Sequence, residues 1–475
     1  MPENLLLSTD NGHYYLNDNV SLLHPELAKS LSDPEAKVDD YYRKKLEYLR
    51  SKKRLEEAKN ATFIELEPSN VEYQLANTPQ VVFEVTDACN LSCKYCAYGE
   101  MYSGYDKRED KMLSVDKAYR MLDYLAKFWN SSLNVSANRI VYVTFYGGEP
   151  LLNMKFIESA VAYVKKLDCP NRFFGFGMTT NAMLLDRYMD FLVENNFKLT
   201  ISLDGDEANT GYRVDHAGNP AYKRIENNVE LLRKKYPDFF ETNISFNAVL
   251  HNKNSVEDIY RFFKNRYNKV PMIGELNPMG IKEEAKAEFM STYRNAWESL
   301  QQSENYTEVE KGLFLRTGNY QSAVAFLHQR SGFVYRDYNH LLYEPTRKFI
   351  PTGTCLPFSK KLFVTVNGKI LPCERIGQQY AVGEITDTEI KLDFEEIAAK
   401  YNAYYASLNK QCAHCKNSNF CRQCIFNLKG LDKNKPICEG FMNNNELKSY
   451  IQTQVEFLAS HRDDYTKIMR DVTIE

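Results

Sequence analysis

The feature that most constrains this chain is the segment CNLSCKYC, which places three thiols, Cys89, Cys93 and Cys96, within eight residues. A structural zinc site takes four nitrogen or sulfur ligands, whereas a redox pair needs two thiols. No cysteine or histidine follows Cys96 within a dozen residues. Three thiolates suit a [4Fe–4S] cluster in which one iron has no protein ligand, although incidental thiols or an unusual zinc loop remain alternatives.

Six strand-like runs alternate with helical patterns between residues 78 and 299. The runs are VVFEVT, IVYVTFY, RFFGFGMTT, KLTISLD, NISFNAVL and PMIGELNP, and the first helical pattern is SVDKAYRMLDYLAKFW. This alternation predicts a parallel sheet, either doubly wound or a barrel. Chemistry gathers at the carboxyl ends of parallel strands, and the cysteine segment directly follows the first run.

The bulk composition excludes several classes of protein. A length of 475 residues predicts two or three domains. A net charge of -3 indicates neither a nucleic-acid partner nor capture by an anionic membrane. The first residues, MPENLLLSTDNGHYY, do not resemble a signal peptide, and no apolar run reaches the roughly 18 residues of a membrane span. We therefore expect a cytoplasmic protein whose eleven cysteines are not disulfides, and their clustering at short spacings favours metal binding.

The C-x3-C-x2-C spacing, with Tyr95 before the last cysteine, resembles the signature of the radical SAM superfamily. The resemblance implies a partial (βα)6 TIM-like barrel over residues 78–299. It also implies that the open iron binds S-adenosylmethionine, which one-electron reduction cleaves to a 5′-deoxyadenosyl radical that abstracts hydrogen. The cofactors carry this chemistry, and the protein supplies orientation. A flavodoxin or ferredoxin is the implied electron donor.

Motifs after the later strands are similar to those of the same superfamily. YGGEP ends the second run, TTN the third and SLDG the fourth, and an arginine follows in GYRVDH. A bidentate contact from this arginine to the methionyl carboxylate is physically apt. Ordinary loop capping and surface pairing remain alternatives for Asn181, Ser202, Asp204 and Arg213. The implied cofactor-binding residues are Tyr95, Gly147, Gly148, Glu149, Pro150, Asn181, Ser202, Asp204 and Arg213.

A second group of cysteines lies between residues 352 and 442, where C-x12-G-x4-C is followed by C-x2-C-x5-C-x2-C and a last cysteine. This region resembles the SPASM domain, which holds auxiliary [4Fe–4S] clusters in peptide-modifying radical SAM enzymes. The usual third spacing is C-x3-C, whereas Cys421 and Cys424 are separated by only two residues, so the spacing here departs from the pattern. In isolation the two C-x2-C pairs would also suit zinc. The resemblance assigns Cys412, Cys415, Cys421 and Cys438 to one cluster and Cys355, Cys373 and Cys424 to another.

Three further residues near these motifs need a role. Glu374 follows Cys373, where a carboxylate is proposed as a proton acceptor in related sulfatase-maturing enzymes, although a salt-bridged or solvent-facing side chain is an alternative. Cys169 is interpreted as a small buried or surface thiol. His414, between two cysteines, is interpreted as a bystander.

The 88 residues before Cys89 bear on the substrate. HYYLNDNVSLLHP predicts a hairpin around residues 17–19, and residues 39–60 predict a helix with a basic surface. Leader-binding domains of peptide maturases bind peptide as an added strand. We therefore expect a maturase that crosslinks a ribosomally made precursor peptide through a thioether or carbon–carbon bond. An anaerobic sulfatase maturase and a non-catalytic peptide-binding partner are the alternatives.

These expectations divide the chain into five segments. They are a leader-recognition-like α+β domain at 1–77, a radical SAM core at 78–299, a helical bridge at 300–351, a SPASM domain at 352–442 and a C-terminal helix at 443–475.

Overall fold

The computed structural model describes residues 6–16, 20–52, 55, 63–136, 139–330, 350–433 and 435–472. The chain folds into two compact units. The first comprises Met1–Glu65, Leu315–Thr354 and Asn402–Glu475, and the second comprises Leu66–Phe314 and Cys355–Tyr401. Among the described helices, none is long and apolar enough to cross a membrane.

The second unit contains the predicted parallel sheet. Its six parallel strands pair in chain order, as the alternating pattern predicts. They are β4 (Gln80–Thr86), β5 (Ile140–Gly147), β6 (Phe173–Thr180), β7 (Lys198–Ser202), β8 (Ile244–Leu250) and β9 (Met272–Glu275). Residues 81–86 of β4 are all buried, as expected for a strand covered on both faces.

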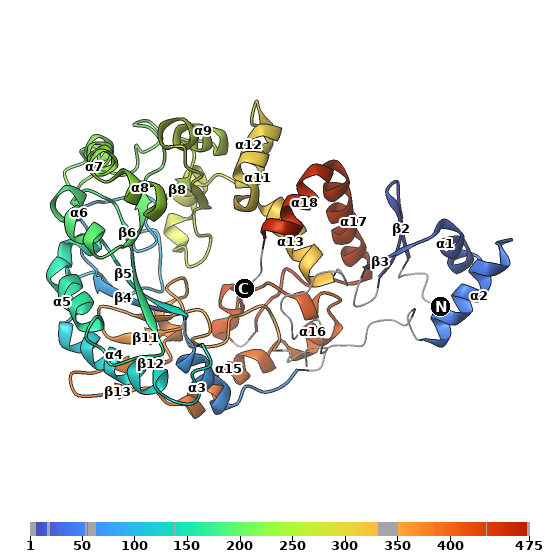
Figure 1. Cartoon of the computed structure of the whole chain (residues 1–475), viewed down its shortest axis with the longest axis horizontal. Helices are drawn as coiled ribbons and strands as arrows, with labels where there is room; N and C mark the ends of the chain where they lie inside the picture. The colour runs from blue at the N-terminus through green and yellow to red at the C-terminus, as the bar shows by residue number, and fades with distance from the viewer. Residues whose placement is uncertain are drawn as a thin grey trace. The chain divides into compact units, whose positions relative to one another are not determined.

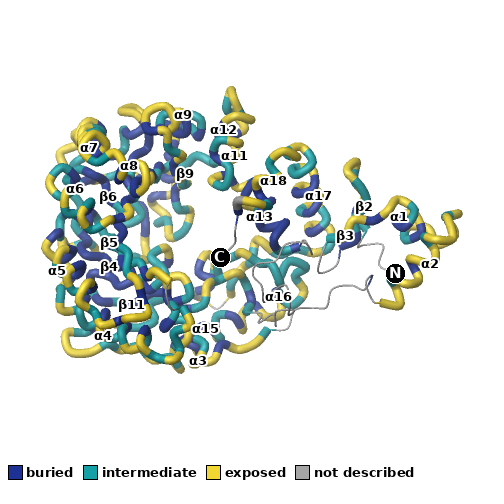
Figure 2. The backbone as a smooth tube through the Cα atoms, viewed as in Figure 1, coloured by how far each residue is buried: buried dark blue, intermediate teal, exposed yellow. Residues whose placement is uncertain are grey.

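Helices follow the strands and lie along one side of the sheet (Figure 1). They are α4 (Val115–Trp129), α5 (Met154–Val164), α6 (Leu185–Glu194), α7 (Tyr222–Lys235), α8 (Pro237–Asn243) and α9 (Val256–Tyr267). Helix α4 begins where Ser114 accepts the Asp116 N–H as an N-cap. Figure 2 shows the strands buried and the outer faces of these helices exposed.

A meander that the sequence analysis did not anticipate extends the same sheet. Strand β10 (Leu362–Val364) runs parallel to β4 on the edge opposite β5, and three antiparallel strands follow it. They are β11 (Lys369–Leu371), β12 (Gly383–Ile385) and β13 (Ile390–Lys391). Because β4 pairs with β5 and β10, the described strands β4 and β9 do not close into a full barrel.

The first unit begins with a three-stranded antiparallel sheet in the order β1 (Leu6–Thr9), β2 (Gly12–Leu16), β3 (Val20–Leu23). The pairing of β2 with β3 confirms the predicted hairpin, whose turn at 17–19 lies outside the described residues. Helices α1 (Pro25–Ser32) and α2 (Asp40–Ser51) follow, so the described helix is shorter than the predicted 39–60. Tyr15, Leu23, Leu27 and Leu46 form the local core.

The remaining helices divide between the two units. Those of the second unit are α3 (Pro68–Ala76), α10 (Lys286–Thr292), α11 (Ala296–Gln301) and α12 (Tyr306–Leu313), while α15 (Phe394–Ala406) spans the boundary. Those of the first unit are α13 (Gly318–Arg330), α16 (Asn409–His414), α17 (Asn444–Ser460) and α18 (Arg462–Asp471). Helix α17 is the predicted C-terminal helix, and it packs against α13. The division into five segments stays a prediction, and residues 352–442 are shared between the units.

Candidate active site

The three-cysteine loop follows β4 and forms tight turns of its own. The Cys96 N–H donates to the Cys93 carbonyl at 3.1 Å, and the Leu91 N–H donates to Cys89 Sγ at 3.5 Å. Burial, with a smaller contribution from the neighbouring thiols, raises the pKa of Cys89 to about 11 and that of Cys93 to about 12. The three predicted ligands therefore lie together.

The donor set of this loop fits an iron–sulfur cluster. Its ligands bind as thiolates, so protons must leave these buried thiols when a cluster binds. Nitrogen donors already point at the sulfurs: Asn181 Nδ2 lies 3.8 Å from Cys89 Sγ, and Arg108 Nη2 lies 3.9 Å from Cys96 Sγ. Among the described residues, no three His, Cys, Asp or Glu side chains form a site for a single metal ion.

The two glycines of GGEP are required because two backbone segments cross closely. A Cβ on Gly147, which has φ of 142°, would lie 2.1 Å from the Thr86 carbonyl oxygen. A Cβ on Gly148 would lie 2.0 Å from the Ala88 carbonyl oxygen. The Glu149 N–H donates to that same Ala88 oxygen at 2.9 Å. The turn therefore locks the end of β5 against the segment that leads into Cys89.

Glu149 holds the ends of two strands together. Its buried carboxylate accepts hydrogen bonds from Thr180 Oγ1 and the Asn181 N–H, both at 2.7 Å, and from the Leu151 N–H at 3.1 Å. Burial raises the pKa of Glu149 to about 7, although these hydrogen bonds oppose the shift. Pro150, also buried, begins the short 3-10 helix Pro150–Asn153. Asn181 reaches the cysteine loop by donating to Asn90 Oδ1 at 2.7 Å.

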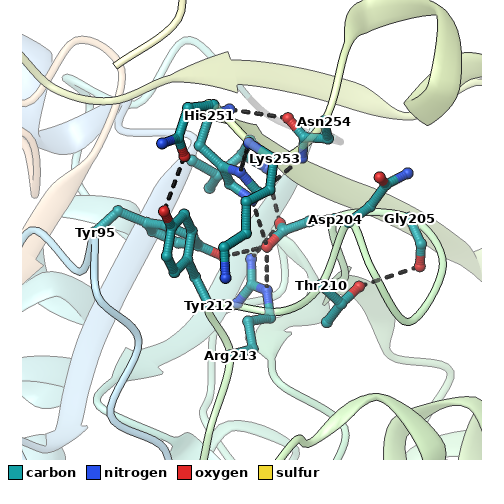
Figure 3. Close-up of polar contacts among 12 residues, drawn as sticks. Tyr95, Asp204, Gly205, Thr210, Tyr212, Arg213, His251, Lys253 and Asn254 are labelled. Carbon is teal, nitrogen blue, oxygen red and sulfur yellow. Dashed lines mark hydrogen bonds and ion pairs between the residues drawn. The ribbon is translucent and has the colours of Figure 1, made fainter. Parts of the chain in front are cut away.

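Asp204 is the centre of a buried polar network after β7 (Figure 3). Arg213 donates to it through Nε at 3.0 Å and Nη2 at 2.8 Å, and the Val249 N–H donates at 2.9 Å. The hydroxyl of Tyr95 also donates to Asp204, and His251 Nε2 lies 3.9 Å away. Burial alone would raise the pKa of Asp204, but Arg213 and the hydrogen bonds lower it to about 2. The network joins the cysteine loop to the ends of β7 and β8.

This network adds protein partners that sequence reasoning did not foresee. Asp204 and Arg213 were expected to face S-adenosylmethionine, and here they bind one another with side chains at most 7% exposed. Tyr95, also expected at the cofactor, stacks on His251 with ring centroids 5.5 Å apart. Ser202, the last residue of β7, is half-buried. The cofactor contacts of these residues stay predictions.

His251 and Arg108 are two site residues that the sequence analysis missed. His251 directly follows β8, so the rule that chemistry gathers at strand ends would have selected it. Arg108 lies in the long loop after Cys96, where no local pattern marks it. Arg108 reaches the site because this loop folds back and brings its guanidinium to Cys96.

Four thiols of the first unit lie together. Cys412 is in α16 and Cys415 ends it, while Cys421 and Cys438 lie in the loops that follow. Burial, together with the other three thiols, raises the pKa of Cys412 to about 12. Backbone N–H groups of Met442 and Gln423 donate to the sulfurs of Cys415 and Cys421, each at 3.4 Å. This donor set fits the four ligands assigned by resemblance.

The second predicted auxiliary set is divided between the units. Cys355 and Cys373 belong to the second unit and Cys424 to the first, so this set stays a prediction. Burial, together with the adjacent Glu374, raises the pKa of Cys373 to about 11. Glu374 is ion-paired with Lys361 at 2.9 Å.

Cys169 and His414 have local contacts that suit their interpretation. Cys169 is 6% exposed, and Asn130 Nδ2 lies 3.8 Å from its sulfur. His414 Nδ1 lies 2.8 Å from the Lys410 carbonyl oxygen within its own helix.

Comparison with known proteins agrees with this architecture. Residues 83–265 match the radical SAM superfamily. The cysteine-type anaerobic sulfatase-maturating enzyme of Clostridium novyi is 23% identical over 71% of this chain and 83% of its own length. The radical SAM cyclopropyl synthase TigE of Paramaledivibacter caminithermalis is 24% identical over 42% of each chain. The structure of native anSMEcpe with bound AdoMet and Kp18Cys peptide has a TM-score of 0.53 at 17% identity, covering 82% of this chain and 99% of that one.

Residues 83–265 therefore form a radical SAM domain. The chain that carries it is homologous to anaerobic sulfatase-maturating enzymes. Enzymes of this superfamily use S-adenosylmethionine and a [4Fe–4S] cluster, and Cys89, Cys93 and Cys96 stay its predicted ligands in this chain.

Proposed function

We propose that this protein is a radical SAM maturase that crosslinks a ribosomally made peptide through a thioether or carbon–carbon bond. The observation that carries the proposal is the small sheet of the first unit. Strand β3 pairs only with β2 among the described strands, so its other edge has no strand partner among them. An open edge can accept an extended peptide as an added strand. Leu22 on β3 is 70% exposed and offers an apolar contact beside that edge.

Helix α2 provides a second contact for such a peptide. Its basic residues include Arg43, Lys45 and Arg50, and two of its aromatic rings, Tyr41 and Tyr48, are each 60% exposed. Lys45 lies over the Tyr41 ring at 5.6 Å. A leader with acidic and apolar side chains would complement this surface.

The crosslink removes two hydrogens from the peptide. When bound, S-adenosylmethionine and the clusters supply hydrogen-atom abstraction and accept the electron that remains. The second hydrogen leaves as a proton, and Glu374 is the residue that we assign to accept it. The ammonium of Lys361 lies 2.9 Å from Glu374 Oε1 and holds this carboxylate in position. Cys412, Cys415, Cys421 and Cys438 would hold one auxiliary cluster.

Sulfatase maturation is the second candidate, favoured by the relationship to the Clostridium novyi enzyme over 71% of this chain. One anaerobic experiment separates the candidates. The reconstituted protein is incubated with S-adenosylmethionine, reductant and either a peptide encoded beside its gene or a sulfatase-derived cysteine peptide.

A leader-dependent loss of two hydrogens from the neighbouring peptide supports the crosslinking maturase. An aldehyde on the sulfatase peptide, detected by hydrazide labelling, would replace the proposal with sulfatase maturation. If neither peptide changes while 5′-deoxyadenosine forms, both substrate classes are wrong.

A further inference from the structure

The loop between Cys96 and α4 folds back and is fastened at two places on either side of Arg108. Asp106 accepts from Lys369 Nζ at 2.6 Å and from Asn367 Nδ2 at 2.7 Å. Beyond Arg108, Asp87 accepts from the Glu109 N–H at 3.1 Å and the Lys111 N–H at 2.6 Å. The backbone on both sides of Arg108 is therefore fixed by side chains from distant parts of the second unit.

This arrangement holds the Arg108 guanidinium against the third cysteine. Nη2 lies 3.9 Å from Cys96 Sγ, and the guanidinium lies over the Tyr98 ring at 4.8 Å. Its positive charge also lowers the pKa of Cys89, although burial dominates that thiol. Arg108 is therefore a fixed cation beside the predicted cluster ligands.

Two buried donors near Cys96 have no partner among the described residues. One is Arg108 Nε, and the other is the hydroxyl of Tyr102, whose residue is 6% exposed. The pKa of Tyr102 is raised to about 12, first by burial and then by the nearby Cys96. A buried donor left without an acceptor is destabilising, so such groups normally face an acceptor. A [4Fe–4S] cluster held by the neighbouring Cys96 would supply anionic sulfur acceptors for such donors.

We propose that Arg108 and Tyr102 donate hydrogen bonds to the cluster held by Cys89, Cys93 and Cys96 and raise its reduction potential. The inference rests on the radical SAM assignment and is independent of the peptide substrate. Reduction adds negative charge to the cluster, which a cation and hydrogen-bond donors at its sulfurs stabilise. These are positioning and tuning residues that make the cluster easier to reduce.

The test is an anaerobic redox titration followed by electron paramagnetic resonance, without peptide. The relevant signal is the one absent from a triple variant with Cys89→Ala, Cys93→Ala and Cys96→Ala. We expect Arg108→Gln to lower the ratio of reduced to oxidised cluster about tenfold at a fixed potential. For one electron, this corresponds to a midpoint about 59 mV more negative. Tyr102→Phe, which loses only the hydroxyl, should shift the midpoint in the same direction by less.

The matched control is Arg224→Gln, which removes a cation paired with Asp186 at 2.8 Å on the surface of α7. An unchanged midpoint in both Arg108→Gln and Tyr102→Phe would overturn the proposal. An equal shift in Arg224→Gln would also overturn it, because the effect would then be one of net charge. If Arg108→Gln fails to bind its full iron, Arg108→Lys and Tyr102→Phe decide the outcome.

Discussion

The two groups of cysteines stand on different kinds of structure. One group follows a seven-residue strand in the middle of a sheet and consists of Cys89, Cys93 and Cys96. The other lies on a six-residue helix and the loops after it and consists of Cys412, Cys415, Cys421 and Cys438. The first group is surrounded by side-chain networks centred on Asp204 and Glu149. For the second group, the contacts to the sulfurs of Cys415 and Cys421 are backbone N–H groups. A sheet can position ligands before a cluster binds, whereas short helices and loops gain much of their order from the cluster itself.

The largest effect should come from removing ligands in each group. We expect Cys412→Ala to lower both the iron content and the melting temperature, because cluster binding contributes folding free energy there. Cys93→Ala should abolish 5′-deoxyadenosine formation while the melting temperature stays near that of the parent. Iron analysis measures the iron content, circular dichroism melts give the melting temperature, and chromatography measures 5′-deoxyadenosine formation. Equal losses of melting temperature in the two variants would contradict the comparison.

Breaking the Asp204 network should cost more than breaking a surface pair. Asp204→Asn leaves Arg213 buried with its charge uncompensated, so we expect the free energy of unfolding to fall by about 3–5 kcal/mol. Asp186→Asn, which breaks the partly exposed pair with Arg224, should cost less than about 1 kcal/mol. Denaturant unfolding of the cluster-free chains gives both values. Similar values for the two variants would mean that the network does not stabilise the sheet end.

A methyl group at Gly148 tests the close crossing behind the cysteine loop. Gly148→Ala places a Cβ against the Ala88 carbonyl oxygen, so the backbone must shift at a cost of about 1–3 kcal/mol. The same change at Gly274 in β9 meets no atom within 4 Å and serves as the control. Reduced cluster binding in Gly148→Ala but not in Gly274→Ala is the expected result, measured by absorbance and iron content. Full cluster binding in both would show that the crossing tolerates the shift.

The smallest predicted effect concerns binding of the precursor peptide by the small sheet of the first unit. Leu22→Asp should weaken binding of the precursor peptide about tenfold, because the substitution replaces an apolar contact beside the open edge with a charge. Val135→Asp changes a similarly exposed apolar residue, 65% against 70%, in the second unit. Fluorescence anisotropy with labelled leader peptide compares them. Equal affinities in both variants would remove the sheet edge from the proposed function.

Local patterns in the sequence predicted much of the second unit. The six runs correspond to β4–β9. Strand β4 is buried along its length, while β5, β7 and β8 alternate buried with less buried residues, and both kinds of apolar pattern are visible in one dimension. The short strands β10–β13 were not predicted, because two or three residues carry no readable period. The turn residues of GGEP were recognised, but their tight approach to Thr86 and Ala88 was not, since the two segments are about sixty residues apart.

By itself, the sequence determined which residues can serve as ligands and where along the chain they stand. The spacing of Cys89, Cys93 and Cys96 is a local property, since three thiols on one loop remain together in any fold. Tertiary structure alone decided which charges face one another. Asp204 meets Arg213, Tyr95 and Val249, and Arg108 meets Cys96, because the sheet and the folded-back loop bring distant segments into contact. Electrostatic interactions depend on distance in space and on burial, and neither can be read from position along the chain.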